Sequence, residues 1–183
     1  MAEVSDDMEL LTQFKNEATK EKAFTATLKK YQEKLYWHIR RMVVEHEDAN
    51  DVLQNMFVKA WKGLANFRED SQLYTWLYRI ATNESLTFLE QQKKRSTVSM
   101  SNEETGLSNK LKADSNFDGN KLEWKLQLAI QKLPEKQKAV FTLRYYDEMP
   151  YNEMSKVLET SEGALKASYH HAVKKIEEYI LNH

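Results

Sequence analysis

Apolar side chains recur at helical spacing through the first half of the chain. Because residues three and four apart share one face of a helix, such rows predict helices with one buried side. We expect a short helix and a long one between Glu9 and Arg41, interrupted near Asn16 to Thr19. A further helix opens at Asp48 and ends near Gly63. The rows run through Leu10, Leu11, Phe14, Phe24, Leu28, Tyr31, Leu35 and Ile39, then Val52, Leu53, Met56, Phe57, Ala60, Trp61 and Leu64, then Leu73, Trp76, Leu77, Ile80, Ala81 and Leu86.

The periodicity is lost between Ser96 and Asn120, a stretch rich in Ser, Asn, Asp, Lys and Gly that predicts a flexible linker. Helical rows then resume and include a break at Pro134, which ends one helix and begins the next. We therefore predict an all-α fold of two small helical domains, residues 1–95 and 121–183, joined by residues 96–120. The second set of rows runs through Leu122, Leu126, Ala129, Ile130 and Leu133, then Val140, Phe141 and Leu143, then Met154, Val157 and Leu158, then Leu165, Tyr169, Ala172, Val173, Ile176 and Ile180.

Composition supports helices and narrows the possible chemistry. The 183 residues include 4 Gly and 2 Pro, too few for the frequent turns of a β-rich fold. The absence of Cys excludes disulfides, thiolate nucleophiles and cysteine-based metal sites, and favours the reducing cytosol. Met1 to Leu10 is acidic without an apolar run, and no later stretch approaches membrane-spanning length. We expect a cytoplasmic protein without direct membrane insertion.

Charge is nearly balanced overall but unevenly distributed. The net charge of −1 argues against indiscriminate binding to nucleic acid, which requires a broadly positive surface. Acidic residues gather at Met1 to Glu9 and Glu45 to Asp51, whereas basic residues gather at Lys93 to Arg95 and Lys166 to Lys175. This distribution is compatible with a protein partner and a DNA partner on different faces.

Two helices joined by a tight turn at Glu159 to Ser161 have the pattern of a helix-turn-helix. Ser161 is suited to cap the second helix, Glu162 suits the positive end of its dipole, and Gly163 permits close packing or approach to a backbone. The periodicity equally describes a solvated amphipathic helix in an ordinary bundle. In the DNA-binding interpretation, the side chains off the apolar row that could reach phosphates or base edges are Lys166, Ser168, His170, His171, Lys174 and Lys175.

The amino-acid sequences of three segments resemble those of the sigma factors of bacterial RNA polymerase. Residues 133–179 read LPEKQKAVFTLRYYDEMPYNEMSKVLETSEGALKASYHHAVKKIEEY and are similar to the promoter-binding fourth region. Upstream, residues 48–61, DANDVLQNMFVKAW, resemble the polymerase-binding part of region two. Residues 67–90, FREDSQLYTWLYRIATNESLTFLE, resemble the adjoining part that opens and reads DNA. With these regions in the family's order and no further domains, the chain is similar to the small extracytoplasmic-function sigma factors.

The resemblance implies partners as well as an activity. It implies binding to core RNA polymerase through the clamp helices and the flap, promoter-specific initiation, a probable anti-sigma factor, and no enzymatic activity or cofactor. The polymerase-facing residues implied are Asp48, Asp51, Gln54 and Asn55, while Phe57, Trp61, Trp76 and Leu77 belong to the core by their place on the apolar rows.

Two sets of DNA-binding residues follow from the same resemblance. The family pattern is broken at Glu90 to Gln92, where many relatives carry arginines, so phosphate contacts are expected to shift to the basic residues that follow. It is broken again at Ala167-Ser168, where relatives often have serine then arginine. The minus-ten set is Asn66, Phe67, Arg68, Ser71, Tyr74, Tyr78, Arg79, Asn83, Thr87, Lys93, Lys94 and Arg95. The minus-thirty-five set is Ser161, Glu162, Gly163, Lys166, Ser168, Tyr169, His170, His171, Lys174 and Lys175.

Three alternatives are weighed beside this hypothesis. A stand-alone helix-turn-helix regulator would bind DNA without polymerase, usually as a dimer, although no dimer helix is obvious. A metal-dependent enzyme could be built on His46, Glu47, Asp48 and Asp51, but their spacing is not that of an H-E-x-x-H site. A structural helical adaptor would explain the apolar rows and leave the resemblance of both regions unexplained.

Overall fold

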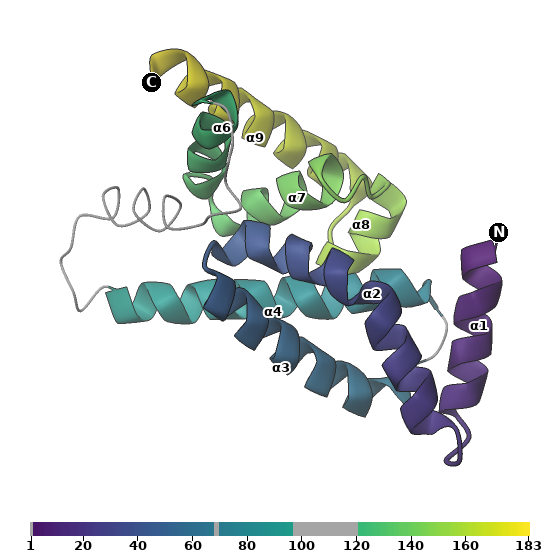
Figure 1. Ribbon diagram of the computed structural model, residues 1–183. Helices are drawn as coiled ribbons and strands as arrows, with labels where there is room; N and C mark the ends of the chain where they lie inside the picture. The colour runs from purple at the N-terminus through teal and green to yellow at the C-terminus, as the bar shows by residue number, and fades with distance from the viewer. Residues whose placement is uncertain (1, 68–69, 97–120) are drawn as a thin grey trace.

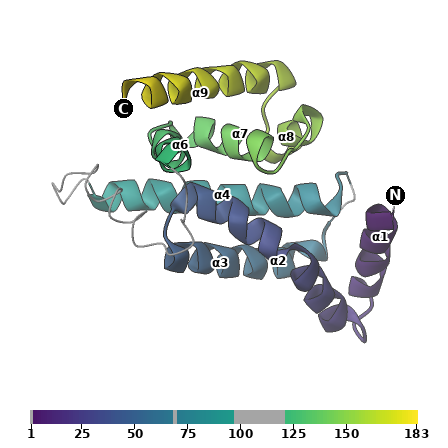
Figure 2. The ribbon, with the colours of Figure 1, turned by 45° about the horizontal axis from the view of Figure 1, so that its top comes forward.

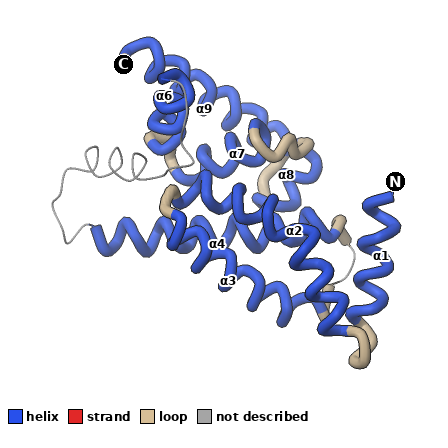
Figure 3. The backbone as a smooth tube through the Cα atoms, viewed as in Figure 1, coloured by secondary structure: helices blue, strands red, loops and turns tan. Residues whose placement is uncertain are grey.

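The computed structural model describes residues 2–67, 70–96 and 121–183, and all the regular secondary structure in these ranges is helical (Figure 3). The predicted all-α fold is therefore confirmed. The elements are α1 (Ala2–Phe14), α2 (Lys20–Val43), α3 (His46–Leu64), α4 (Leu73–Ser96), α6 (Lys121–Gln131), α7 (Glu135–Tyr145), α8 (Tyr151–Leu158) and α9 (Glu162–Asn182).

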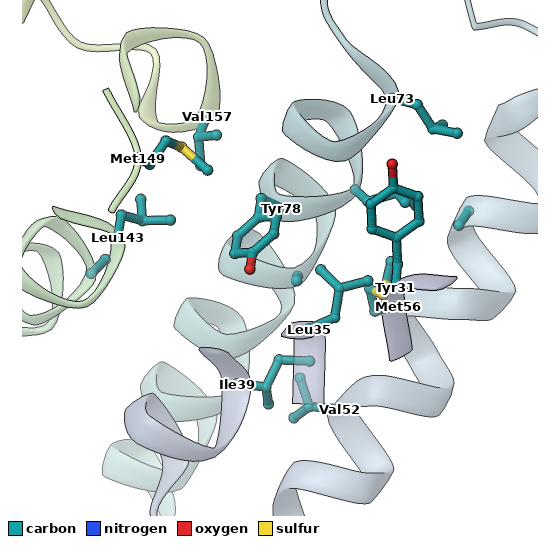
Figure 4. Packing of buried hydrophobic residues seen from close by; sticks show 14 of the residues in the cluster. Tyr31, Leu35, Ile39, Val52, Met56, Leu73, Tyr78, Leu143, Met149 and Val157 are labelled. Carbon is teal, nitrogen blue, oxygen red and sulfur yellow. The ribbon is translucent and has the colours of Figure 1, made fainter. Parts of the chain in front are cut away.

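Helices α2, α3 and α4 form the first bundle, with α1 packed beside α2 (Figure 1). Leu35, Ile39 and Met56 are buried at its centre (Figure 4). The α1–α2 corner is held by aromatic contacts, because the Phe14 ring lies 5.5 Å from Trp61 and 6.2 Å from Phe24 between centroids. The apolar rows of these four helices thus meet in one buried cluster.

Helices α6 to α9 form the second bundle, in which α9 packs against α6, α7 and α8. Phe141 is central to it, since its ring stacks on Tyr145 at 5.1 Å and on Tyr169 at 5.8 Å. Ile130 and Ile176 are buried in the same cluster. The predicted interruption by Pro134 is also present, because this residue is the N-cap of α7.

Helix boundaries agree with the sequence-based expectations except at the first helix, which begins at Ala2 rather than at Glu9. The break between the first two helices falls at Lys15 to Thr19. Helix α3 begins at His46 rather than Asp48, after a turn in which Val44 has φ of 73°. Most of the expected linker, residues 97–120, lies outside the described residues.

The two bundles are packed against each other, which the sequence did not predict. Helices α7 and α8 lie on α2 and α4 (Figure 2). A single buried cluster accordingly contains Leu35 and Tyr78 of the first bundle together with Leu143, Met149 and Val157 of the second (Figure 4). We call this contact between the bundles the seam.

None of the described helices combines the length and the apolar character that spanning a membrane requires.

Lys138 on α7 has an unfavourable position. It is 5% exposed, and its Nζ donates a hydrogen bond to Gln131 Oε1 at 2.7 Å. Burial lowers the pKa of Lys138 to about 8, while Glu135 raises it less. The folded state thus binds the proton less tightly than the unfolded state, so its charge opposes folding at neutral pH.

Replacing Lys138 with Met is expected to raise the free energy of unfolding at pH 7. The gain should be about 1 to 2 kcal/mol, because the cost of burying the charge is partly offset by the lost hydrogen bond. The gain should shrink as the pH rises above about 8, where the wild-type side chain loses its proton in the folded state. Urea unfolding at several pH values measures this, with Lys136→Met on the exposed side of α7 as the control. Equal stability of both variants at pH 7 would contradict the assignment.

Candidate nucleic-acid interface

The turn between α8 and α9 has helix-turn-helix geometry. Helix α8 ends at Leu158, and its C-cap Glu159 has φ of 50° and ψ of 42°, a left-handed conformation that redirects the chain. Ser161 then caps α9, accepting a hydrogen bond from the Ala164 N–H at 3.3 Å. The predicted cap is confirmed. Leu165 and Ala172 anchor one side of α9 in the core, so its opposite side faces outward.

The outward side of α9 carries most of the predicted minus-thirty-five residues. Lys175 Nζ reaches Gln137 at 3.1 Å, and Lys166 Nζ lies 5.5 Å from the centre of the Tyr151 ring. Tyr169 is half-buried against Phe141, and burial raises the pKa of its phenol. Ser168 is also half-buried, while those exposed are Ser161, Glu162, Gly163, Lys166, His170, His171, Lys174 and Lys175.

Gly163 packs against no other side chain or backbone in the described part of the chain. A Cβ built at this position would meet no atom within 4 Å among the described residues. The alternative that Gly163 permits close internal packing is therefore wrong, and approach by an external backbone stays a prediction. Gly63 differs, because a Cβ there would lie 3.0 Å from the Trp76 ring.

Helix α3 presents the predicted polymerase-facing residues together. Asp51, Gln54 and Asn55 are exposed, and Asp48 is half-buried near the start of the helix. The opposite row, Val52, Met56 and Ala60, is buried, which fixes the outward direction of the polar residues.

The metal-site alternative on α3 has little support. Both ring nitrogens of His46 are engaged, since Nδ1 lies 2.7 Å from the Tyr36 hydroxyl and Nε2 lies 3.0 Å from Asn50 Nδ2. No group of three metal-ligating side chains occurs in the part of the chain that is described. The acidic residues at this helix start are those that favour the positive end of a helix dipole.

The predicted minus-ten residues differ in their exposure to solvent. Phe67 is half-buried, with its ring 5.3 Å from Trp76, and Arg68 lies outside the described residues. Phosphate contacts were expected to shift to the basic residues at this end of α4. One of these, Lys94, forms an ion pair with Glu90 at 2.8 Å, so its positive charge is partly neutralised. Ser71 and Tyr74 are half-buried, and the exposed members are Asn66, Arg79, Asn83, Thr87, Lys93, Lys94 and Arg95.

Two members of the set contact the second bundle, and only one of them is buried. Tyr78 is buried, and its hydroxyl donates to Asp147 Oδ1 at 3.4 Å. Arg79 forms an ion pair with Glu159 at the helix-turn-helix turn. In this arrangement, therefore, these two side chains are directed to the second bundle rather than to an external ligand.

The sequence reasoning missed His38 and the acids that complete the seam. His38 falls on the apolar side of α2, three residues after Leu35, and is 0% exposed. A histidine within an apolar row was the available signal of a buried polar contact. Asp147, which follows α7, carried no comparable signal because acidic residues in turns are usually solvated.

Comparison with known proteins places both bundles in one family. Residues 27–95 match the family model described as Sigma-70 region 2, and residues 123–176 match Sigma-70, region 4. The RNA polymerase sigma-H factor of Pseudomonas aeruginosa is 31% identical over 165 residues, covering 86% of each chain. The ECF RNA polymerase sigma-E factor of Escherichia coli is 32% identical over 170 residues, covering 87% of each chain.

Solved structures show the same fold. The structure of CnrH in complex with the cytosolic domain of CnrY has a TM-score of 0.68 and 21% identity, covering 94% of this chain and 96% of that one. The sigma factor RpoE of Bartonella quintana, in complex with the anti-sigma factor NepR, has a TM-score of 0.66 and 20% identity, covering 87% and 97%.

The order of the two matched regions and the extent of the sequence identity agree with the helix-turn-helix and the two-bundle fold. Sigma factors are non-enzymatic factors of transcription initiation, so the polymerase supplies the catalysis. The chain belongs to the extracytoplasmic-function family of RNA polymerase sigma factors.

Proposed function

We propose that this chain acts in the cytoplasm and directs core RNA polymerase to one set of promoters through three separate surfaces. The polar side of α3, with Asp51, Gln54 and Asn55, binds the clamp helices of the polymerase. The loop after α3 and the outer side of α4 read and open the minus-ten element. The outward side of α9 binds the minus-thirty-five element. The domain limits proposed are 1–95 and 121–183, joined by 96–120.

The observation that carries this proposal is the outward side of a capped α9 within a region 4 match. Ser161 fixes the start of the helix, and Leu165 fixes its rotation, so Lys166, His170 and Lys174 share an accessible side. Such a side suits a major groove, where cationic side chains contact phosphates and imidazoles contact base edges.

The two proposed DNA-binding surfaces, for the minus-ten and minus-thirty-five elements, can reinforce each other because they belong to one chain. Each DNA contact alone is small, and the net charge of −1 provides little general attraction to DNA. Once both domains are held on the polymerase, the second contact becomes intramolecular and the two reinforce each other. Binding by the free chain is therefore expected to be poor compared with binding by the holoenzyme.

An anti-sigma factor is proposed as the regulatory partner. The two structural neighbours were solved with the cytosolic domain of CnrY and with the anti-sigma factor NepR, respectively. A partner of that kind would cover the polymerase-binding and DNA-binding surfaces until a signal arrives. Affinity purification of the tagged chain from unstressed cells would test this. Recovery of polymerase without any second regulator would count against it.

Run-off transcription tests the function directly. Purified core polymerase is incubated with fragmented genomic DNA, with and without the chain, and the transcripts are sequenced. We expect new start sites that share two upstream motifs. A chain that binds DNA but neither binds core polymerase nor creates start sites would instead be a stand-alone helix-turn-helix regulator.

Reversing the charge of Asp51 together with Gln54→Ala should weaken binding to core polymerase. We expect a loss of about tenfold, because one favourable charge pair becomes repulsive and one amide contact is removed. Competition for core polymerase against a labelled wild-type chain measures the loss, and circular dichroism confirms that helicity is retained. Glu177→Lys on exposed α9 is the control for a charge reversal elsewhere. If the double variant competes as well as the wild-type chain, the polar side of α3 does not bind the polymerase.

Replacing Lys166 and Lys174 with Ala should weaken promoter binding by the holoenzyme and flatten its dependence on salt. Each lost phosphate contact removes released counterions, so the slope of log K against log salt should fall by about 2 for the pair. The matched control removes Lys22 and Lys29, two exposed lysines of α2. Equal slopes for the two double variants would place the DNA-facing side elsewhere.

A further inference from the structure

His170 lies between two lysines on the outward side of α9. Because residues four apart share one side of a helix, Lys166, His170 and Lys174 form a row, and all three are exposed. The two lysines are eight residues apart, which corresponds to about 12 Å along a helix. The imidazole in the middle of this span makes the row continuous in positive charge when the ring is protonated.

His171 belongs to a neighbouring row whose earlier members are small. Gly163 and Ala167 precede it by two turns and one turn, and both are exposed. A Cβ at Gly163 would meet no other atom within 4 Å in the described part of the chain. Lys175 follows one turn later, and its Nζ lies 3.1 Å from Oε1 of Gln137 on α7. DNA can therefore approach the start of this row closely, and it meets the imidazole of His171 and a lysine at the other end.

No carboxylate of α9 lies beside the two imidazoles. Glu162 and Glu177, the nearest acids along this helix, are at least six residues from either histidine. Glu153 of α8 and its C-cap Glu159 are bonded to side chains of α4. The two rings have centroids 6.1 Å apart with 57° between their planes, and neither forms a hydrogen bond or ion pair within the described residues. Their nitrogen atoms are therefore available to an external partner.

Adjoining helices place cations and phenols near this part of α9. Lys166 Nζ lies 5.5 Å from the centre of the Tyr151 ring of α8, and the Arg144 guanidinium of α7 lies 5.1 Å from the same centre. Tyr145 of α7 lies near Tyr169 together with these groups. Helix α6 meets α9 through the apolar side chains of Leu126, Ala129 and Ile130. Because phenols are neutral near pH 7, the fixed charge around the two imidazoles is positive.

Imidazole differs from these fixed cations because its charge changes within the physiological range of pH. A histidine side chain gains its proton between about pH 8 and pH 5. Phosphate oxygens and the guanine edge both present acceptors to a major-groove helix, and an acceptor of negative charge favours the protonated ring. The DNA-bound form then holds more protons than the free form. By linkage, affinity for DNA must rise as the pH falls.

We propose that His170 and His171 bind acceptor atoms of the minus-thirty-five element as imidazolium cations, so that promoter binding by the holoenzyme strengthens in acid. This inference rests on the proposed function, because it takes the outward side of α9 as the surface that meets the promoter. Lys166 and Lys174 supply charge throughout the range, and the imidazoles add to it only when protonated. A fall in cytoplasmic pH is thus sensed by the DNA-binding helix itself.

The test measures the affinity of the holoenzyme for a labelled promoter duplex, chosen from the run-off transcripts, at about pH 8 and about pH 6. The wild-type chain should gain about tenfold in affinity at the lower pH. The double variant His170→Gln with His171→Gln should lose this gain, because its amides hydrogen-bond but do not titrate. His183→Gln, at an exposed histidine of the same region of the chain, is the matched control and should keep the gain.

A second double variant fixes the charge instead of removing it. With His170→Arg and His171→Arg the side chains stay cationic at both pH values, so the affinity should be nearly the same at each. The salt dependence of the wild-type chain identifies the acceptors. A slope of log K against log salt that steepens by about 1 to 2 in acid assigns them to phosphates, and an unchanged slope assigns them to base edges. Circular dichroism confirms that each variant is folded.

Two contrary results have different meanings. An equal gain at low pH in the wild-type chain and in the double Gln variant would overturn the inference, because another group would then bind the proton. A gain that persists in the double Arg variant would overturn it as well. A holoenzyme that binds no promoter duplex at either pH and creates no start sites would instead refute the proposed function.

Discussion

A carboxylate withdrawn from water must be met by donors, and in this chain that requirement is met across a domain boundary. Asp147 is 6% exposed, and the groups that satisfy it, His38, Tyr78 and Arg41, all lie in the other bundle. Removing one partner of such a pair costs more than the pair contributes, because a buried charge is then left alone. The two bundles are consequently held in one defined orientation, on which the accessibility of α4 depends.

Different sides of α4 have different roles in this arrangement. Leu73 and Leu77 are buried in the cluster that includes the α2 and α3 core, so they keep the first bundle together. Thr75, Tyr78 and Thr82 carry hydroxyls to the seam. A helix whose polar side is satisfied by hydroxyls and cations tolerates exchange of one anionic partner for another. The same seam also buries Leu143, Met149 and Val157 in one apolar cluster with side chains of the first bundle, so polar and apolar contacts share it.

The helices themselves could be predicted from sequence because they follow local rules. Rows of apolar residues such as Leu35 and Ile39 determine which side of a helix is buried, and Ser161 marks a start through its own hydroxyl. The seam could not be predicted in this way. His38 and Asp147 are 109 residues apart, and no local pattern records that one will meet the other. The prediction that Gly163 permits close internal packing was wrong for a related reason. Internal packing depends on which residues lie nearby in space, and the periodicity of the sequence does not determine this.

The near-neutral composition acquires a different meaning once the seam is known. A net charge of −1 describes the whole chain, but three acids of the second bundle contact the first: Asp147 lies beside Arg41, Glu153 accepts from Thr75, and Glu159 pairs with Arg79. The electrostatic potential that an approaching DNA strand meets therefore depends on which bundle faces the strand, and not on the net charge of the chain. With the bundles together, Arg79 of α4 is paired with Glu159 at an exposed position, and Arg41 of α2 lies beside the buried carboxylate of Asp147. With the bundles apart, the same cations face solvent and the acids move away with the second domain. The charge that each face of a chain of balanced composition presents therefore depends on how its two bundles are arranged, which the overall charge alone would not reveal.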